Sequence, residues 1–200
     1  MAEAIDFYFD FSSPYGYLAA QRIDGMAKKL GRNAVWRPFL LGAVFKTTGS
    51  EPLLNIPMKG VYARTDLART ARRLGVAFKL PDPFPFPSIA ACRAFYSLSD
   101  DNAEVAKDFA KALYWAAFGE GKDISSAQGV LAVASESGLD CDRLSEAIQT
   151  PEIKARLREE VEIAIGKGVF GSPFFIVDGE PFWGNDRLSD VESWIEKGGW

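Results

Sequence analysis

Apolar and polar side chains alternate at the start of the chain, in the segment I-D-F-Y-F-D-F that covers residues 5–11. A period of two is typical of a strand. Ser12-Ser13-Pro14 follows, and this is a typical helix start because serine caps well and proline fits the first turn. The pattern then predicts a helix over residues 15–30 and a strand over residues 34–39, which complete a strand–helix–strand crossover unit.

The middle of the chain is predicted to be mainly helical. Residues 42–60 are interrupted by glycine and proline, and residues 79–88 contain four prolines, so both segments are predicted to be loops. Helices are predicted over residues 62–74 and, with glycine-containing breaks, over the alanine-rich residues 89–148.

Strand signals return near the end of the chain. A helix is predicted over residues 150–166, followed by a hairpin whose strands cover residues 170–178 and 180–183 and whose turn contains Gly179. A closing helix is predicted over residues 186–197. Sheet-forming elements therefore lie at both ends of the chain, with a helical block between them.

The chain contains no histidine. This absence excludes Ser-His-Asp and Cys-His catalysis, histidine-ligated metals and imidazole acid–base chemistry. Cys92 and Cys141 lie too far apart for a CxxC redox motif or a zinc site, and we interpret both as buried or half-buried apolar residues. No metal site is predicted, so any chemistry must come from hydroxyls, carboxylates, amines or a bound cofactor.

Charge and hydropathy give no indication of a nucleic acid or a membrane as a partner. The net charge is −4, and a basic excess would be needed to attract polyanions. No segment reaches the roughly 20 apolar residues that span a bilayer, and the acidic start of the chain lacks the basic flank of a secretory signal. We therefore predict a cytoplasmic protein.

Four stretches of the chain together carry a resemblance to a known family. They are Phe9–Ala19, Leu40–Phe45 with Pro57–Gly60, Val169–Val177 and Phe182–Leu188. In this order and spacing, the chain resembles the kappa-class glutathione transferases and the 2-hydroxychromene-2-carboxylate isomerases. That group is related to the disulfide oxidoreductases of the thioredoxin superfamily.

The resemblance implies an α/β fold in which an all-helical insertion interrupts a thioredoxin-like domain with a mixed sheet. Residues 1–45 and 155–200 would form the discontinuous thioredoxin-like domain, and residues 46–154 the insertion. This arrangement agrees with the order of elements that the residue pattern predicts. The family also implies a homodimer, which nothing in the chain itself indicates.

Ser13 is the candidate catalytic residue. From the residues alone it could be a helix cap or a functional hydroxyl. In redox relatives a thiol stands at this helix start, where free N–H groups and a partial positive charge stabilise a thiolate. The resemblance implies that Ser13 instead donates a hydrogen bond to the thiolate of bound glutathione, which favours the ionised form. The neighbouring Ser12 is interpreted as structural.

The resemblance also implies which residues bind glutathione as a cofactor. A cis peptide bond at Pro173 would expose the backbone of Ser172 to the cysteinyl part of the tripeptide. Asn185 and Asp186 would bind the γ-glutamyl part, although either could simply cap the last helix.

Two further binding residues are expected before the long helical block. Lys59 would pair with the glycyl carboxylate of glutathione, although a loop lysine is often only solvated. Ser50 falls where the kappa-class enzymes often have an asparagine that contacts the ligand, and its side chain has a shorter reach. Arg187 is expected to be a structural ion-pair partner.

Three functions are open. The first is a glutathione-dependent isomerase that converts 2-hydroxychromene-2-carboxylate, a small aromatic carboxylate, to trans-o-hydroxybenzylidenepyruvate. In it, the glutathione thiolate adds reversibly to a conjugated double bond, the resulting single bond rotates, and elimination returns the thiolate. The alternatives are a kappa-class-like transferase that conjugates small electrophiles, and a non-catalytic thioredoxin-fold binding module.

The sequence indicates the residues that would contact the substrate less clearly than those that would bind glutathione. Arg93 could meet a substrate carboxylate or make an ion pair. Residues 86–91 lack the asparagine and arginine that the isomerases tend to carry just before this helix, which leaves the substrate open. Five aromatic residues could either line an apolar pocket or belong to the core: Phe45, Phe84, Phe86, Trp115 and Trp183.

Overall fold

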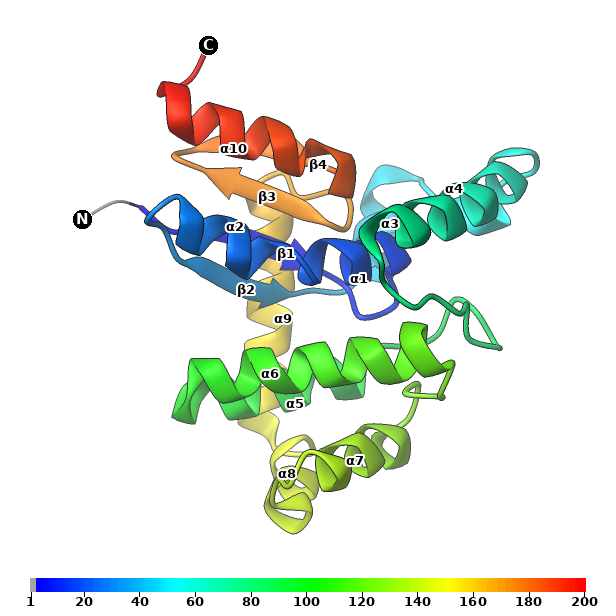
Figure 1. Cartoon of the computed structure of the whole chain (residues 1–200). Helices are drawn as coiled ribbons and strands as arrows, with labels where there is room; N and C mark the ends of the chain where they lie inside the picture. The colour runs from blue at the N-terminus through cyan, green and yellow to red at the C-terminus, as the bar shows by residue number, and fades with distance from the viewer. Residues whose placement is uncertain (1–2) are drawn as a thin grey trace.

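A computed structural model describes residues 3–200 of the chain. At its centre lies a mixed sheet of four strands in the order β2-β1-β3-β4 (Figure 1). β1 and β2 are parallel, whereas β3 is antiparallel to both β1 and β4. The strands are β1 Ile5–Phe9, β2 Ala34–Pro38, β3 Phe174–Val177 and β4 Glu180–Trp183.

Helices cover both faces of this sheet. In Figure 1, α1, α2 and α10 lie in front of the strands, and α9 runs behind them toward a separate layer of helices. These four helices are α1 Pro14–Ala20, α2 Ile23–Lys29, α9 Pro151–Gly166 and α10 Leu188–Lys197. The mixed sheet and its covering helices confirm the predicted α/β thioredoxin-like fold with an additional helical region.

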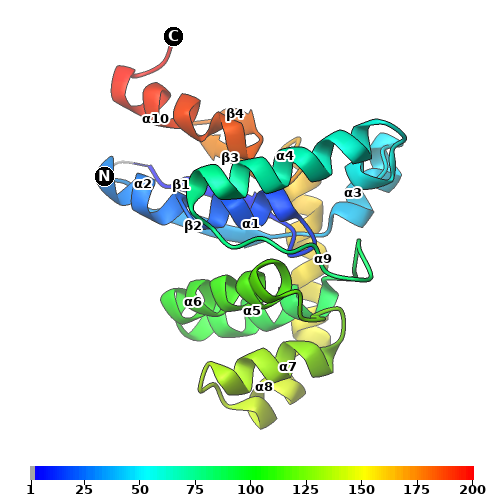
Figure 2. The same cartoon turned by 45° about the vertical axis from the view of Figure 1, so that its right-hand side comes forward.

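The remaining helices fall into two groups (Figure 2). One group, α3 Leu41–Thr48, the short η1 Leu53–Asn55 and α4 Lys59–Leu74, brings α4 against α1. The other group forms the separate layer below the sheet: α5 Ile89–Asp101, α6 Ala103–Tyr114, the π-helical η2 Trp115–Glu120, α7 Ala127–Glu136 and α8 Cys141–Ala147. The exact boundaries of the predicted insertion, 46–154, stay a prediction.

A continuous series of aromatic rings joins the sheet to the helical layer. Phe9 of β1 lies 5.7 Å from Tyr114 at the end of α6, measured between ring centroids. Tyr114 in turn packs 6.2 Å from Phe118 of η2, which stacks on Tyr17 of α1 at 5.7 Å. All four rings are buried. One hydrophobic core therefore extends across both layers.

The largest departure from the sequence prediction is α3. Residues 42–60 are predicted to be a loop, but residues 41–48 form a helix that ends at Gly49 in the left-handed conformation. The first N–H group of this helix, that of Leu41, donates to the carboxylate of Asp10 at 2.8 Å. A distant side chain thus stabilises the start of α3, and such a partner is invisible in the local pattern.

Smaller departures concern helix ends. The helix predicted over residues 15–30 is two helices, α1 and α2, separated by Gln21 and Arg22. Asn102 divides α5 from α6, because its side chain accepts the backbone N–H groups of Glu104 and Val105. The last helix begins with the 3-10 turn η3, Asn185–Arg187, in place of a regular cap.

Candidate active site

The Ser13 hydroxyl makes two hydrogen bonds at the start of α1. Its Oγ accepts the backbone N–H of Gly16 at 3.0 Å, so Ser13 caps the helix. The same hydroxyl donates to the backbone oxygen of Ser172 at 2.9 Å. Ser13 is only 4% exposed. It therefore caps the helix and also reaches the loop before β3, so the capping role and a position at the predicted site are compatible.

The loop that faces Ser13 contains the predicted cis bond between Ser172 and Pro173. The Ser172 Oγ accepts the backbone N–H of Asp10 at 2.9 Å, and the oxygen of Pro173 accepts the N–H of Gly184 at 3.0 Å. These bonds fasten the cis-proline loop to the end of β1 on one side and to the start of η3 on the other. Residues from both ends of the chain thus meet at Ser13.

Asn185 and Asp186 lie in η3, which packs against α1. Neither side chain caps the last helix, so the alternative that they are simple caps does not hold, and their binding role stays a prediction. Asn185 is 3% exposed, and its Oδ1 finds no hydrogen-bond partner among residues 3–200. Asp186 is exposed and accepts from Arg187 at 2.9 Å, which confirms Arg187 as an ion-pair partner. A buried acceptor without a donor is costly and is satisfied by water or a ligand.

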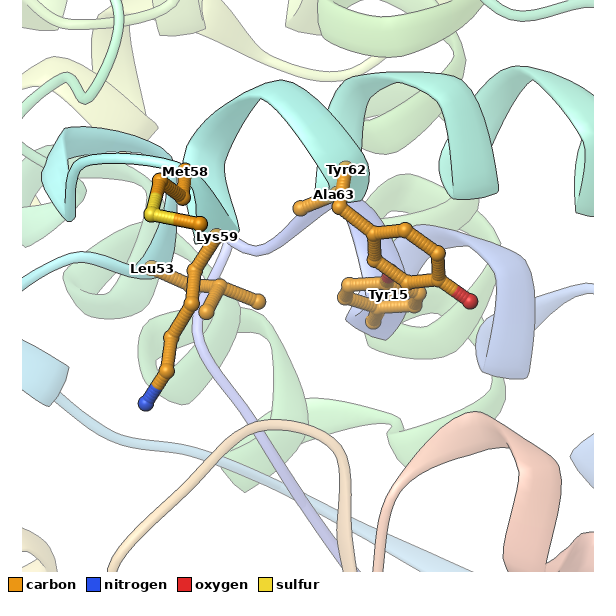
Figure 3. A pocket seen from close by; sticks show the side chains of 6 residues that line it. All are labelled: Tyr15, Leu53, Met58, Lys59, Tyr62 and Ala63. Carbon is orange, nitrogen blue, oxygen red and sulfur yellow. The ribbon is translucent and has the colours of Figure 1, made fainter.

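Lys59 is the first residue of α4 and lies at a pocket of about 460 Å³ (Figure 3). In Figure 3 its side chain extends beside Leu53, and its ammonium group lies apart from the rings of Tyr15 and Tyr62. Within residues 3–200, Lys59 makes no ion pair. The pocket is almost entirely apolar and is lined by Tyr15, Leu53, Met58, Lys59, Tyr62 and Ala63.

Tyr15 connects this pocket to Ser13, because it lines the pocket and lies in the first turn of α1, two residues after Ser13. Its hydroxyl donates to Asp66 at 2.8 Å, and burial together with that carboxylate raises the pKa of Tyr15 above its usual value. Ser50, by contrast, is exposed in the segment between α3 and η1, and in the described part of the chain its side chain makes no hydrogen bond. The structure thus places Lys59 beside the pocket but does not bring Ser50 into contact with it.

Asp10 is a residue of this site that the sequence reasoning missed. Its carboxylate is buried and accepts two backbone N–H groups, from Ser12 and Leu41, each at 2.8 Å. Burial raises the pKa of Asp10, while these bonds and the Ser88 hydroxyl lower it in part. Aspartate side chains often accept the backbone N–H two residues later and so form a turn. Asp10 followed by Ser12 fits this pattern, which could have indicated the role of Asp10.

Among the other candidates of the sequence analysis, Ser12, Phe84 and Phe86 have structural roles. Ser12 accepts the N–H of Phe86 at 3.1 Å and so attaches the proline-rich loop to the start of α1, as its structural interpretation predicts. Phe86 is buried and packs with Phe84 around Phe118. Phe45 is half-buried. Trp115 and Trp183 are about half exposed, at 46% and 57%.

Arg93 and the cysteines complete the predicted candidates. Arg93 is half-buried, its Nε has no hydrogen-bond partner, and it makes no ion pair within residues 3–200. Cys92 is buried and Cys141 half-buried, and both are free, as predicted. Among the described residues no cluster of histidine, cysteine or carboxylate side chains could hold a metal ion, and no helix is long and apolar enough to cross a membrane.

The Ser13 hydroxyl lies at a helix start and faces a cis-proline loop. Together with the mixed sheet and the added helical layer, this arrangement defines a thioredoxin-like protein. Residues 4–196 match the family model of the DSBA-like thioredoxin domain. The chain is 34% identical over 197 residues to the 2-hydroxychromene-2-carboxylate isomerase of Sphingobium xenophagum, which covers 98% of this chain and 99% of that protein.

Two further comparisons agree. The chain is 26% identical to human glutathione S-transferase kappa 1 over 94% of this chain and 88% of that one. The solved structure of a 2-hydroxychromene-2-carboxylate isomerase superimposes with a TM-score of 0.86 at 28% identity, covering 97% of this chain and 95% of the other. The protein belongs to the family of DSBA-like thioredoxin domains that contains these isomerases and kappa-class transferases.

The residues packed around Ser13 leave no room for a side chain at Gly16. A Cβ there would lie 2.5 Å from the Tyr114 hydroxyl and 3.0 Å from the Ser172 Oγ. Because Tyr114 is fully buried, we predict that Gly16→Ala lowers the free energy of unfolding by about 1–3 kcal/mol, measured by urea denaturation. Gly25→Ala on α2 is the control, since its Cβ would meet nothing within 4 Å, and it should be neutral or stabilising. Equal effects of the two substitutions would contradict this tight packing.

Proposed function

We propose that this protein is a glutathione-dependent isomerase that converts 2-hydroxychromene-2-carboxylate to trans-o-hydroxybenzylidenepyruvate. The observation that carries the proposal is the Ser13 hydroxyl, 2.9 Å from the backbone oxygen of Ser172 at the helix start. A hydroxyl at this place cannot exchange disulfides, but it can stabilise a thiolate that a ligand brings. The full-length similarity to the isomerase of Sphingobium xenophagum supports the same assignment.

The residues around Ser13 fit glutathione. The free acceptor of Asn185 and the exposed carboxylate of Asp186 suit the ammonium of the γ-glutamyl part. The backbone of Ser172 suits the cysteinyl part, which would add to it as a short strand. Lys59, which has no carboxylate partner within residues 3–200, suits the glycyl carboxylate. Ser50 is the weakest of the proposed contacts, because the structure shows no side-chain contact for it.

Bound glutathione would supply a thiolate that adds reversibly to the conjugated double bond of the substrate, so that this bond can rotate before elimination. The chain's own part is to hold the sulfur in its ionised form. Ser13 would turn its hydroxyl proton from the oxygen of Ser172 toward the sulfur while its Oγ continues to accept the N–H of Gly16. The apolar pocket beside Tyr15 would keep water from the aromatic part of the substrate.

A transferase is the second candidate. The similarity to human glutathione S-transferase kappa 1 and the lack of asparagine and arginine in residues 86–91 both favour it, and the thiolate site would be the same. A non-catalytic binding module is the third possibility, and it requires that the site bind no glutathione. The homodimer remains a prediction of the resemblance, and the cytoplasmic location remains a prediction from the sequence.

Product analysis separates these functions. With 2-hydroxychromene-2-carboxylate and a catalytic amount of glutathione, the isomerase should form trans-o-hydroxybenzylidenepyruvate in many turnovers while free glutathione stays constant. Chromatography of the mixture would measure both. A conjugate that accumulates in proportion to the glutathione consumed would indicate the transferase, and a lack of glutathione binding in calorimetry would indicate the binding module.

Ser13→Ala tests the hydroxyl directly. We predict that turnover falls about 100-fold while glutathione affinity changes far less, because the substitution removes thiolate stabilisation and leaves the other ligand contacts. Steady-state kinetics and calorimetry would measure the two quantities. The control is Ser126→Ala, which removes a comparable cap of α7 at a similar cost of about 1 kcal/mol and should leave turnover unchanged. Full activity of Ser13→Ala would refute the assignment and direct attention to Ser12 or Tyr15.

Lys59→Ala tests the contact with the glycyl carboxylate. An exposed ion pair contributes up to about 1 kcal/mol, so we predict a loss of glutathione affinity of about twofold to fivefold in calorimetry. The affinity for γ-glutamylcysteine, which lacks the glycine, should be the same in both proteins. Lys46→Ala, at an exposed lysine in the last turn of α3, serves as the control. If γ-glutamylcysteine lost affinity equally, Lys59 would not contact that carboxylate.

A further inference from the structure

Every polar group of Asp10 makes a hydrogen bond to a residue at or near the site of Ser13. Its backbone N–H donates to the Ser172 Oγ at 2.9 Å. Its backbone oxygen accepts the N–H of Ser13 and the hydroxyl of Tyr114, both at 2.9 Å. Its two carboxylate oxygens accept the N–H groups of Ser12 and Leu41, both at 2.8 Å. Asp10 thus links the turn that carries Ser13, the cis-proline loop and the start of α3.

This arrangement determines where the Ser13 hydroxyl lies. The turn from Asp10 to Ser13 is closed by the Ser13 N–H on the Asp10 oxygen and by the Ser12 N–H on the carboxylate. The opposite wall, at Ser172, is held by the Asp10 N–H. One residue therefore sets both sides of the 2.9 Å contact between Ser13 and Ser172.

We propose that Asp10 is the positioning residue of this site and that it holds the Ser13 hydroxyl at the place where it meets the sulfur of glutathione. The proposal rests on the proposed function. Asp10 is 4% exposed, and its backbone and carboxylate contacts face protein groups, so it acts through Ser13 and Ser172 without touching the substrate. Displacing a catalytic group by about 1 Å can lower turnover about 100-fold.

The Asp10→Asn substitution separates two ways in which Asp10 could act, by position or by charge, because they predict opposite changes in turnover. The amide keeps the size of the side chain, but its NH₂ group would face one of the two N–H donors, so the turn must shift. The substitution also removes a buried negative charge, which by itself would favour a nearby thiolate. If Asp10 acts by position, turnover falls; if it acts only by its charge, turnover at neutral pH stays or rises.

The first experiment compares Asp10→Asn with the wild-type protein. We expect kcat to fall about 100-fold with little change in the dissociation constant of glutathione measured by calorimetry. In the ligand-free protein, hydrogen exchange at the N–H of Gly16 should accelerate, because that N–H donates to the Ser13 Oγ. The control is Asp24→Asn on α2, whose carboxylate accepts the Trp36 indole N–H at 2.9 Å and pairs with Lys111 at 2.7 Å; it should leave kcat and Gly16 exchange unchanged.

Ser172→Ala provides a second test and keeps the inference falsifiable if Asp10→Asn does not fold. It removes the acceptor of the Asp10 N–H but leaves the carboxylate charged. We expect a lower kcat and faster exchange at Gly16. In titrations of glutathione bound to the variant, ultraviolet absorbance of the thiolate should show a raised thiol pKa, because Ser13 no longer meets the sulfur.

The outcomes are distinguishable. If the wild-type protein binds no glutathione, the proposed function fails and this inference fails with it. If the wild-type protein binds glutathione and catalyses the reaction but Asp10→Asn keeps its kcat or exceeds it, the inference alone is overturned. Unchanged Gly16 exchange and thiol pKa in Ser172→Ala would overturn it equally.

Discussion

The hydrogen bond between the Ser13 hydroxyl and the backbone oxygen of Ser172 joins two segments that are 159 positions apart in the chain. It depends on the antiparallel pairing of β1 with β3, in which Tyr8 lies opposite Phe174. Because the end of β1 thereby meets the start of β3, the turn before α1 and the cis-proline loop face each other. The helical layer could be inserted between these strands in sequence because it leaves this pairing intact.

Asp10 shows how the fold tolerates a buried charge at this junction. Three helices begin around its carboxylate: α1 after Ser13, α3 at Leu41 and α5 after Ser88. Unpaired N–H groups at helix starts stabilise an anion, and one of them, that of Leu41, bonds the carboxylate directly. The second donor, the N–H of Ser12, belongs to the turn before α1. Desolvation nevertheless prevails and raises the pKa of Asp10. The same contacts connect the loops that form the site.

Much of the fold could be predicted from the sequence, and the local parts most reliably. The strand β1, the Thr150 cap of α9 and the turn around Gly179 are predicted by local signals, and the structure contains all three. The period of two in the β1 sequence does not extend to burial, because Tyr8 is as buried as Phe7 and Phe9. The position of Ser13 at a helix start is likewise local. What it faces is not, because the Ser172 and Asp10 contacts arise only from tertiary pairing. The α3 helix was missed for the same reason, since its first N–H group bonds to Asp10.

The aromatic series from Phe9 through Tyr114 to Phe118 has a consequence for how the molecule comes apart. Because these rings form a single core that spans the sheet and the helical layer, neither layer can lose its packing without exposing apolar surface of the other. The chain should therefore melt in one cooperative transition despite its interrupted topology. A ligand seated at α1 would raise the melting temperature of the distant helices α7 and α8 along with that of the sheet.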